Sequence, residues 1–186
     1  MLKVAAAGLL VAIVAVAVAL VFQYRESSAQ VGGDKVAETV TYAKDPVEMV
    51  YLGELKPSGQ AVSFSLAQVK TASLAAFTYT RSTPLSADFQ AVMGGNVLPL
   101  ISYVAPSGRL VVATSFCEPC RSYSFHIEGN ELVCNTCFTR WSLDTLEGVS
   151  GGCQTFPPEE LVATVSGDNV TVALGPLEAW QPRVSN

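Results

Sequence analysis

All five cysteines of this 186-residue chain lie between positions 117 and 153. Four of them form two Cys-x-x-Cys pairs, Cys117 with Cys120 and Cys134 with Cys137. A Cys-x-x-Cys turn directs both sulfurs toward one small ion, so two such turns supply four soft ligands. Tetrahedral Zn²⁺ or iron suits such a set. We therefore expect the chain to fold so that the two pairs converge on one metal centre.

Two other kinds of cysteine chemistry compete with a metal centre: local disulfides, and buried thiols that pack as small apolar side chains. Complete disulfide pairing would leave one thiol over, because the number of cysteines is odd. A disulfide within a Cys-x-x-Cys pair closes a very short loop and constrains little of the unfolded chain. The pattern thus favours Cys117, Cys120, Cys134 and Cys137 as metal ligands.

The fifth cysteine, Cys153, follows Gly151 and Gly152. Two glycines let the backbone approach the site closely, so we expect the Cys153 sulfur to lie within about 8 Å of the other four. The sequence leaves three roles open for this residue: a fifth ligand, a substitute ligand, or a redox thiol near the metal.

The single histidine, His126, is not expected to bind the metal. In the alternating segment between the pairs it falls opposite Phe125 and Ile127, which places it on the solvent face. Arg121 and Phe138 follow the two Cys-x-x-Cys pairs, where c-type haem attachment requires a histidine, so that attachment is excluded. No nucleophile–base pair stands out, and an accessory protein fits the sequence better than an enzyme.

Side chains behind the two pairs are candidates for tuning the centre. Four thiolates around a divalent ion carry a net charge of about −2, which Arg121 and Arg140 could offset, although both also suit an ordinary protein surface. Phe138 and Trp141 are expected to pack over the second pair and exclude water.

An apolar segment near the N-terminus, residues 4–22, contains no charged or polar side chain. As a helix it would measure about 28 Å, close to the thickness of the bilayer hydrocarbon. A cleaved signal peptide is the alternative, with a small-residue site at 27–29, but the run is longer than the usual apolar core of such peptides. We expect an uncleaved anchor with the remaining chain outside the cytoplasm.

Nothing before this run is typical of a twin-arginine signal. A chain exported unfolded would acquire its metal outside the cytoplasm, which favours a simple ion over a preassembled cluster.

Downstream of the anchor the sequence predicts a mainly β protein. Val62, Phe64 and Leu66 alternate with serines, and the segments 97–104 and 110–113 flank a proline–glycine turn. Further hairpins are expected at 123–133 and 161–174. We divide the chain into an anchor (1–28), a linker (29–45), a β region (46–109) and an antiparallel β domain carrying the four-cysteine site (110–182).

Residues 110–177 resemble the FtrD-like family of membrane iron–sulfur-containing proteins. The resemblance rests on the segments 116–120 and 131–137, and on Gly151-Gly152-Cys153 with prolines soon after. It implies an accessory role in ferrous-iron uptake, beside a membrane permease and periplasmic metal-binding proteins, and an iron or iron–sulfur centre.

The segment from Leu132 onward is also similar to the second cluster loop of Rieske domains. Cys137 stands where those domains have histidine, and Cys120 replaces the histidine of the first loop, with a different spacing. The departure implies an all-cysteine centre on a Rieske-like or rubredoxin-like scaffold.

These observations predict a membrane-anchored metal-centre protein that acts in electron transfer or in iron or copper handling, beside a permease or membrane complex. The alternative is a structural zinc protein that serves as an interaction subunit without redox chemistry. The net charge of −5 is spread along the chain without a basic patch, which argues against nucleic acid as a partner.

Overall fold

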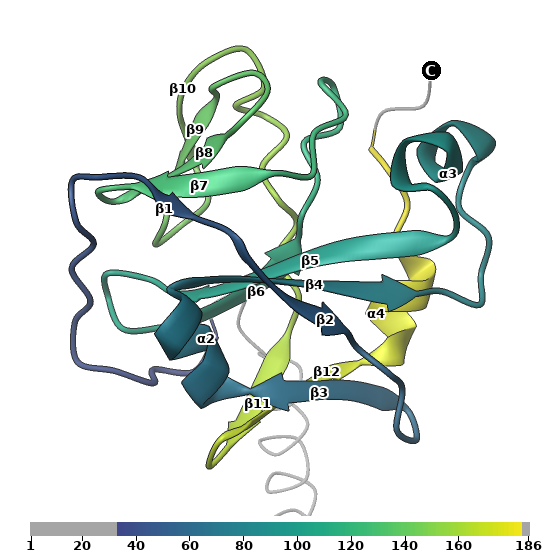
Figure 1. Cartoon of the computed structure of the whole chain (residues 1–186), viewed down its shortest axis with the longest axis horizontal. Helices are drawn as coiled ribbons and strands as arrows, with labels where there is room; N and C mark the ends of the chain where they lie inside the picture. Colours follow the sequence, from purple (N-terminus) through teal and green to yellow (C-terminus); the bar gives the residue numbers. More distant parts are fainter. Residues whose placement is uncertain (1–32, 184–186) are drawn as a thin grey trace, which may run out of the picture. The chain divides into compact units, whose positions relative to one another are not determined.

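The computed structural model describes residues 33–183, and a four-stranded sheet lies at its centre (Figure 1). The strand order is β2-β4-β5-β6. The β4–β5 and β5–β6 pairs are antiparallel, whereas β2 runs parallel to β4. The strands are β2 (Val50–Glu54), β4 (Leu74–Thr80), β5 (Val97–Val104) and β6 (Leu110–Thr114).

Both faces of this central sheet are buried, which explains why β5 is almost continuously apolar in sequence. Phe77 and Leu100 point to one hydrophobic core, and Ile101 and Tyr103 point to a second. Successive side chains of a strand face opposite ways, so one apolar run serves two cores. The second core contains the cysteines.

A three-stranded antiparallel sheet and short helices cover the first face. Phe64 stacks on Phe77 with ring centroids 4.6 Å apart, and Leu177 and Trp180 belong to the same core. The sheet has the order β11-β12-β3. These elements are β3 (Ala61–Ser65), α2 (Leu66–Ala72), α3 (Ala87–Met93), β11 (Ala163–Ser166), β12 (Asn169–Ala173) and α4 (Leu174–Ala179).

A five-stranded antiparallel sheet belongs to the second core, with the order β1-β7-β8-β9-β10. Phe125 and Trp141 meet edge to face at 6.2 Å, and the Tyr103 hydroxyl donates to the Leu143 carbonyl at 3.1 Å. The strands are β1 (Val47–Glu48), β7 (Phe125–Glu128), β8 (Glu131–Cys134), β9 (Arg140–Ser142) and β10 (Gly148–Ser150). This sheet carries the second cysteine pair.

The prediction of a mainly β protein is confirmed, and so are its three hairpins. The Gly108 amide donates to the Ala105 carbonyl at 2.8 Å and closes the turn between β5 and β6. Two details differ from expectation: β2 pairs in parallel, and three short helices occur. Ser65 starts α2 by accepting a hydrogen bond from the Gln68 amide, a cap that strand periodicity does not reveal.

Residues 35–42, within the segment expected to be a linker, are hydrogen-bonded to the turn between β5 and β6. The Val36 amide donates to the Gly108 carbonyl at 2.8 Å, and the Val40 amide donates to the Pro106 carbonyl at 3.1 Å. The Tyr42 hydroxyl donates to the Val104 carbonyl at 2.7 Å, and burial raises the pKa of Tyr42 to about 12.

The membrane anchor predicted at residues 4–22 lies outside the described residues. Among residues 33–183, no helix combines the length and the apolar character needed to cross a bilayer.

We predict that Gly108→Ala destabilises the fold far more than Gly167→Ala. A Cβ at Gly108 would lie 2.0 Å from the Ala37 carbonyl oxygen, whereas nothing lies within 4 Å of one at Gly167. Both glycines have positive φ, 87° and 61°, so both variants share a backbone cost of about 1–2 kcal/mol. Only Gly108→Ala adds a backbone clash, so this variant should lose about 3 kcal/mol or more of its free energy of unfolding.

Urea denaturation of the two variants measures this difference in the free energy of unfolding. Equal losses would show that residues 35–42 do not press against the turn.

Candidate metal centre

The two cysteine pairs adopt the same local backbone structure. The Cys117 amide donates to the Ser122 carbonyl at 2.7 Å, and the Cys134 amide donates to the Thr139 carbonyl at 3.0 Å. In each case the acceptor lies five residues after the first cysteine. Each pair is thus a knuckle, a tight turn that presents two sulfurs on one side.

The residue after the second cysteine of each knuckle has a left-handed backbone. Arg121 has φ 57° and Phe138 has φ 56°. This conformation turns the chain away from the sulfurs, and it costs a residue with a Cβ about 1–2 kcal/mol. The same strain at equivalent positions indicates that both knuckles serve one geometry.

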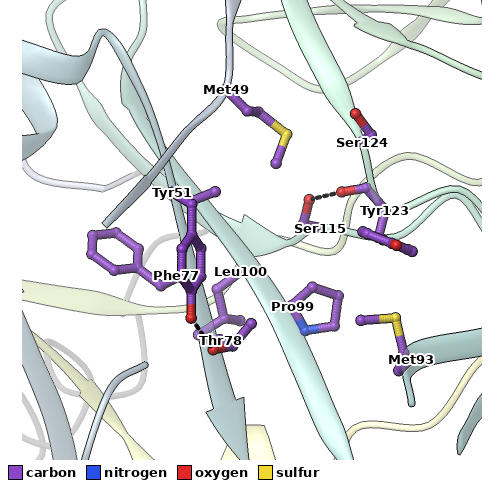
Figure 2. A pocket seen from close by; sticks show the side chains of 11 residues that line it. Met49, Tyr51, Phe77, Thr78, Met93, Pro99, Leu100, Ser115, Tyr123 and Ser124 are labelled. Atoms are coloured by element: carbon purple, nitrogen blue, oxygen red, sulfur yellow. Dashed lines mark hydrogen bonds between the residues drawn. The ribbon is translucent and has the colours of Figure 1, made fainter. Parts of the chain in front are cut away.

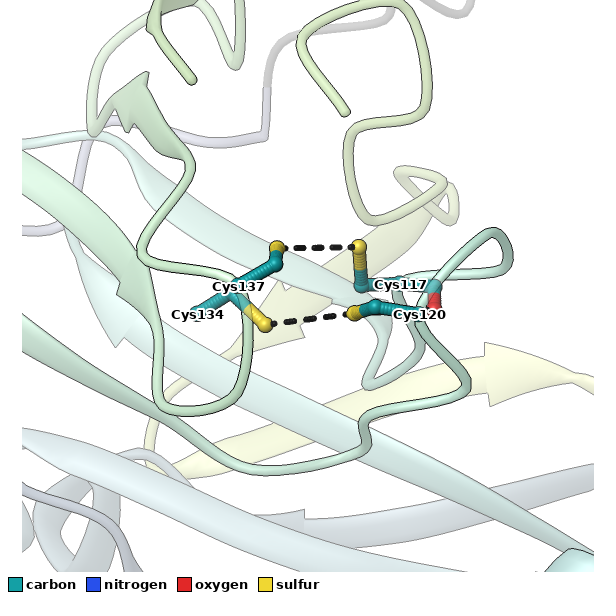
Figure 3. Close-up of side chains that lie close together, drawn as sticks. All are labelled: Cys117, Cys120, Cys134 and Cys137. Atoms are coloured by element: carbon teal, nitrogen blue, oxygen red, sulfur yellow. Dashed lines mark hydrogen bonds between the residues drawn. The ribbon is translucent and has the colours of Figure 1, made fainter. Parts of the chain in front are cut away.

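Neighbouring strands bring the knuckles together (Figure 3). The first knuckle follows β6, and the second begins at the last residue of β8, where Cys134 pairs with Phe125 of β7. The Asn135 amide donates to the Ser124 carbonyl at 3.0 Å, which ties the second knuckle to the segment leaving the first. The hairpin therefore fixes the distance between the two pairs.

The four sulfurs of Cys117, Cys120, Cys134 and Cys137 lie within 4.8 Å of one another. The Sγ atoms of Cys117 and Cys137 are 3.9 Å apart, and those of Cys120 and Cys134 are 3.6 Å apart. Both contacts cross from one knuckle to the other, as Figure 3 shows. A tetrahedron with metal–sulfur bonds of about 2.3 Å has edges of about 3.8 Å. The donor set therefore fits one tetrahedral ion.

All five thiols are free, so the local disulfides considered from the sequence are absent from the described residues. Cys117 and Cys134 are fully buried, whereas Cys120 and Cys137 are partly exposed. The four-sulfur group thus has a buried side in the second core and a side near the surface.

Hydrogen bonds between thiols and burial shift the titration of this group. The interaction between the Cys117 and Cys134 thiols lowers the pKa of Cys134 and raises that of Cys117. Burial raises the pKa of Cys120 to about 12. A metal ion binds thiolates, so binding here must displace protons from these thiols.

Cys153 lies beside the four-sulfur group. It is buried and belongs to the same core as Cys117 and Cys134. The Cys153 sulfur is not one of the four sulfurs that all lie within 4.8 Å of one another. Burial raises the pKa of this thiol.

Two residues near the site were not identified from the sequence. Thr139 is fully buried, and its hydroxyl contacts the Cys137 sulfur at 3.3 Å and accepts the Cys153 amide at 3.1 Å. Glu118, inside the first knuckle, is buried. Arg183 Nε donates to its carboxylate and lies 2.9 Å from each of the two oxygens. A threonine and a glutamate in a turn are too common for sequence alone to mark them.

One prediction about covering residues is wrong. Phe138 does not pack over the second knuckle: its side chain is 67% exposed. The left-handed backbone at Phe138 directs the side chain outward. Trp141, in contrast, is fully buried in the core that contains the cysteines, and its indole N–H donates to the Gln154 carbonyl at 3.1 Å.

Arg140 binds carboxylates on the outside of the five-stranded sheet. Its guanidinium pairs with Glu131 at 2.9 Å and also with Glu128. This arrangement supports the surface role left open for Arg140. Arg121 is exposed.

His126 lies on the opposite side of β7 from the buried Phe125 and Ile127, as expected, and is not part of the four-sulfur group. It is nevertheless mostly covered, with its side chain 12% exposed. Its Nδ1 contacts the Asn135 side-chain oxygen, and Nε2 lies 3.4 Å from a Glu128 oxygen.

A separate cavity has a volume of about 400 Å³ (Figure 2). It lies on the central sheet, where Thr78 and Pro99 line it together with Met49, Met93 and Tyr123. No cysteine and no charged residue lines this cavity. It is therefore distinct from the metal centre.

Comparison with known proteins agrees with this geometry. Residues 86–184, more than half of the chain, match the model of a family described as membrane iron-sulfur containing protein FtrD-like. No curated protein and no solved structure matches the chain. The chain belongs to the FtrD-like family, as its cysteine segments suggested.

We predict that Phe138→Gly stabilises the protein by about 1 kcal/mol. Glycine adopts φ 56° without strain, and the exposed ring contributes little burial that would be lost. Phe138→Ala is the matched control, because it removes the ring but keeps the strained Cβ.

The urea midpoints of both variants test this prediction. A loss of stability in Phe138→Gly would show that the ring makes a contact on which the knuckle depends.

Proposed function

We propose that this FtrD-like protein is a membrane-anchored electron-transfer protein of an iron-handling membrane system. Its centre would be one iron ion bound by Cys117, Cys120, Cys134 and Cys137. Iron bound by four thiolates exchanges one electron without changing its ligands. The family match and the cysteine group support metal handling, and the electron-transfer role extends this support.

The separation of the sulfurs is the observation that carries the proposal. All four lie within 4.8 Å of one another, which leaves room for one ion at their centre. A sulfide-bridged cluster inserts further iron and sulfide atoms between the thiolates, so it needs a wider separation than this. A single iron with four cysteine ligands suits the geometry better.

One side of this site is buried and held by backbone hydrogen bonds, and the other side is partly exposed. Cys117 and Cys134 are fixed in the second core, where backbone hydrogen bonds hold both knuckles. Cys120 and Cys137 are partly exposed, and the exposed ring of Phe138 follows Cys137 directly. A rigid ligand set needs little rearrangement when its charge changes. The exposed side is where a partner could approach for electron transfer.

The membrane location rests on the apolar run at residues 4–22 and on the family description. We propose that this run anchors the chain, with the metal domain outside the cytoplasm and a permease or membrane complex as its partner. A single ion is easily acquired there, because it needs no assembly before export.

Structural zinc is the second candidate, and the same closed set of four thiolates favours it. Tetrahedral zinc sites with four cysteines stabilise a fold without redox chemistry. The protein would then be an interaction subunit of the membrane complex. Copper, the third ion considered, is also a soft-ligand metal.

Metal analysis of the full-length protein, purified from its native membrane, separates these candidates. We expect one iron per chain, with visible absorption that bleaches on reduction with dithionite and returns on reoxidation. A colourless protein with one zinc per chain would refute electron transfer and support the structural role.

We further predict that Cys120→Ser and Cys137→Ser each weaken metal binding by more than about 100-fold. Loss of a ligand should exceed the 10- to 100-fold effect typical of losing an outer partner. Thr136→Ala is the matched control, because Thr136 lies in the second knuckle with an exposed side chain.

Competition with a chromophoric chelator measures the affinity of each variant. Retention of wild-type affinity in both serine variants would show that the four cysteines do not form the binding site.

A further inference from the structure

Only part of the second face of the central sheet belongs to the second core. Leu74 of β4 and Ile101 of β5 lie in that core. Thr78 and Pro99 pair across the same two strands and face the same way, because each lies an even number of residues away along its strand. They line the cavity of about 400 Å³ instead. The cavity therefore lies over the part of this face that the second core does not include.

The walls of this cavity are aromatic rings and thioethers (Figure 2). Tyr51 lies on one side and Tyr123 on the other, and these residues are 61% and 47% exposed. Met49 and Met93 complete the walls. The lining contains no charged residue, so a charged ligand would lose its hydration without gaining an ionic partner. The cavity therefore suits a neutral ring compound, and its volume is in the range typical of small-molecule sites.

Hydroxyl groups stand on two sides of the cavity. The Tyr51 hydroxyl lies 2.9 Å from Thr78 Oγ1, and one of the two donates to the other. Each hydroxyl carries one hydrogen, so this pair keeps a hydrogen that can be donated to a ligand. Tyr123 brings a second phenol group from the opposite side (Figure 2). A neutral ligand that satisfies both sides therefore has a hydrogen-bond acceptor at each end.

Hydrogen bonds hold the walls in place before any ligand binds. The Ser115 hydroxyl donates to the Tyr123 carbonyl at 2.9 Å, and the Met49 sulfur accepts the Phe125 amide at 3.1 Å. Phe125 is also the strand partner of Cys134, the first residue of the second knuckle. The cavity is therefore preformed, and little ordering opposes binding.

We propose that this cavity is a binding site for the ring of a quinone. A para-quinone is planar and neutral, and its two carbonyl oxygens lie at opposite ends of the ring. One oxygen accepts from the pair of Tyr51 and Thr78, and the other accepts from Tyr123. The apolar faces of the ring contact Pro99 and the methionine sulfurs, which pack favourably against rings. No bond forms or breaks on binding, and the site goes beyond the proposed function without resting on it.

Methionine methyl groups give a readout at the site itself. The chain has three methionines, and two of them, Met49 and Met93, line the cavity. The full-length protein, with ¹³C-labelled methionine methyls, is placed in lipid nanodiscs and loaded with zinc, which avoids the line broadening that iron causes. Duroquinone is the probe, because its four methyl groups block addition of thiols. We expect it to shift both methyl resonances until the site is saturated.

Durene is the matched control ligand, since it has the same ring and methyl groups without the carbonyl oxygens. It should bind about tenfold more weakly, because it lacks two hydrogen bonds. Tyr123→Phe, and the double variant Tyr51→Phe with Thr78→Val, should each weaken duroquinone binding by about threefold to tenfold. Durene binding should stay unchanged in both variants, which shows that the cavity remains folded.

Menaquinone-4, which stays in the nanodisc lipid, distinguishes two sources of the quinone. Shifts with menaquinone-4 assign a lipid-borne quinone, and shifts with duroquinone alone assign a water-soluble one. Both results support the site.

Three results would overturn the proposal: no shift with either quinone, equal affinity for duroquinone and durene, or wild-type duroquinone affinity in both variants. Equal affinity for the two rings would make the cavity a general apolar site. A protein that binds duroquinone but neither iron nor zinc would instead overturn the proposed function and leave the quinone site standing.

Discussion

The register of the β7–β8 hairpin is the constraint on which the metal centre depends. Pairing of Phe125 with Cys134 places the start of the second knuckle opposite the segment that leaves the first. Because side chains alternate along a strand, a shift of one residue would turn Cys134 away from the core and expose Phe125. The apolar side chains that fill the second core therefore also set the position of the sulfurs. The same strand register is therefore needed both to pack the core and to place the cysteine sulfurs.

The sulfurs lie in a core that disfavours charge. Thiolates are poorly solvated among side chains such as Ile101 and Trp141, and burial raises the pKa of Cys153. The pKa of Cys117 is raised first by its hydrogen bond with Cys134 and then by burial. A divalent or trivalent ion offsets that cost by binding the thiolates directly. The fold and the ion are thus expected to stabilise each other. An ion bound by these four sulfurs would also hold the two knuckles together where they meet the packed core.

Sequence reasoning identified the features that depend on short spacings. The Cys-x-x-Cys pairs, the hairpin between them and the turn ending at Gly108 are local patterns, and the structure contains each of them. Features that depend on distant contacts were missed. Nothing local shows that Thr139 meets the Cys153 loop, or that Phe138 turns outward on a left-handed backbone. The parallel β2–β4 pair joins segments separated by β3 and α2, so periodicity could not reveal its direction.

The segment 47–54 belongs to two sheets at once. Its first part, β1, pairs with β7 of the cysteine-bearing sheet, and its second part, β2, pairs with β4 of the central sheet. Between them the Met49 sulfur accepts the Phe125 amide at 3.1 Å. Without this segment, β7 would become an open edge, with unpaired backbone groups available to another chain. The cysteine-bearing half is therefore not a portable module. The edge of its sheet at β7 is covered by β1, which precedes the first cysteine by more than sixty positions in the chain.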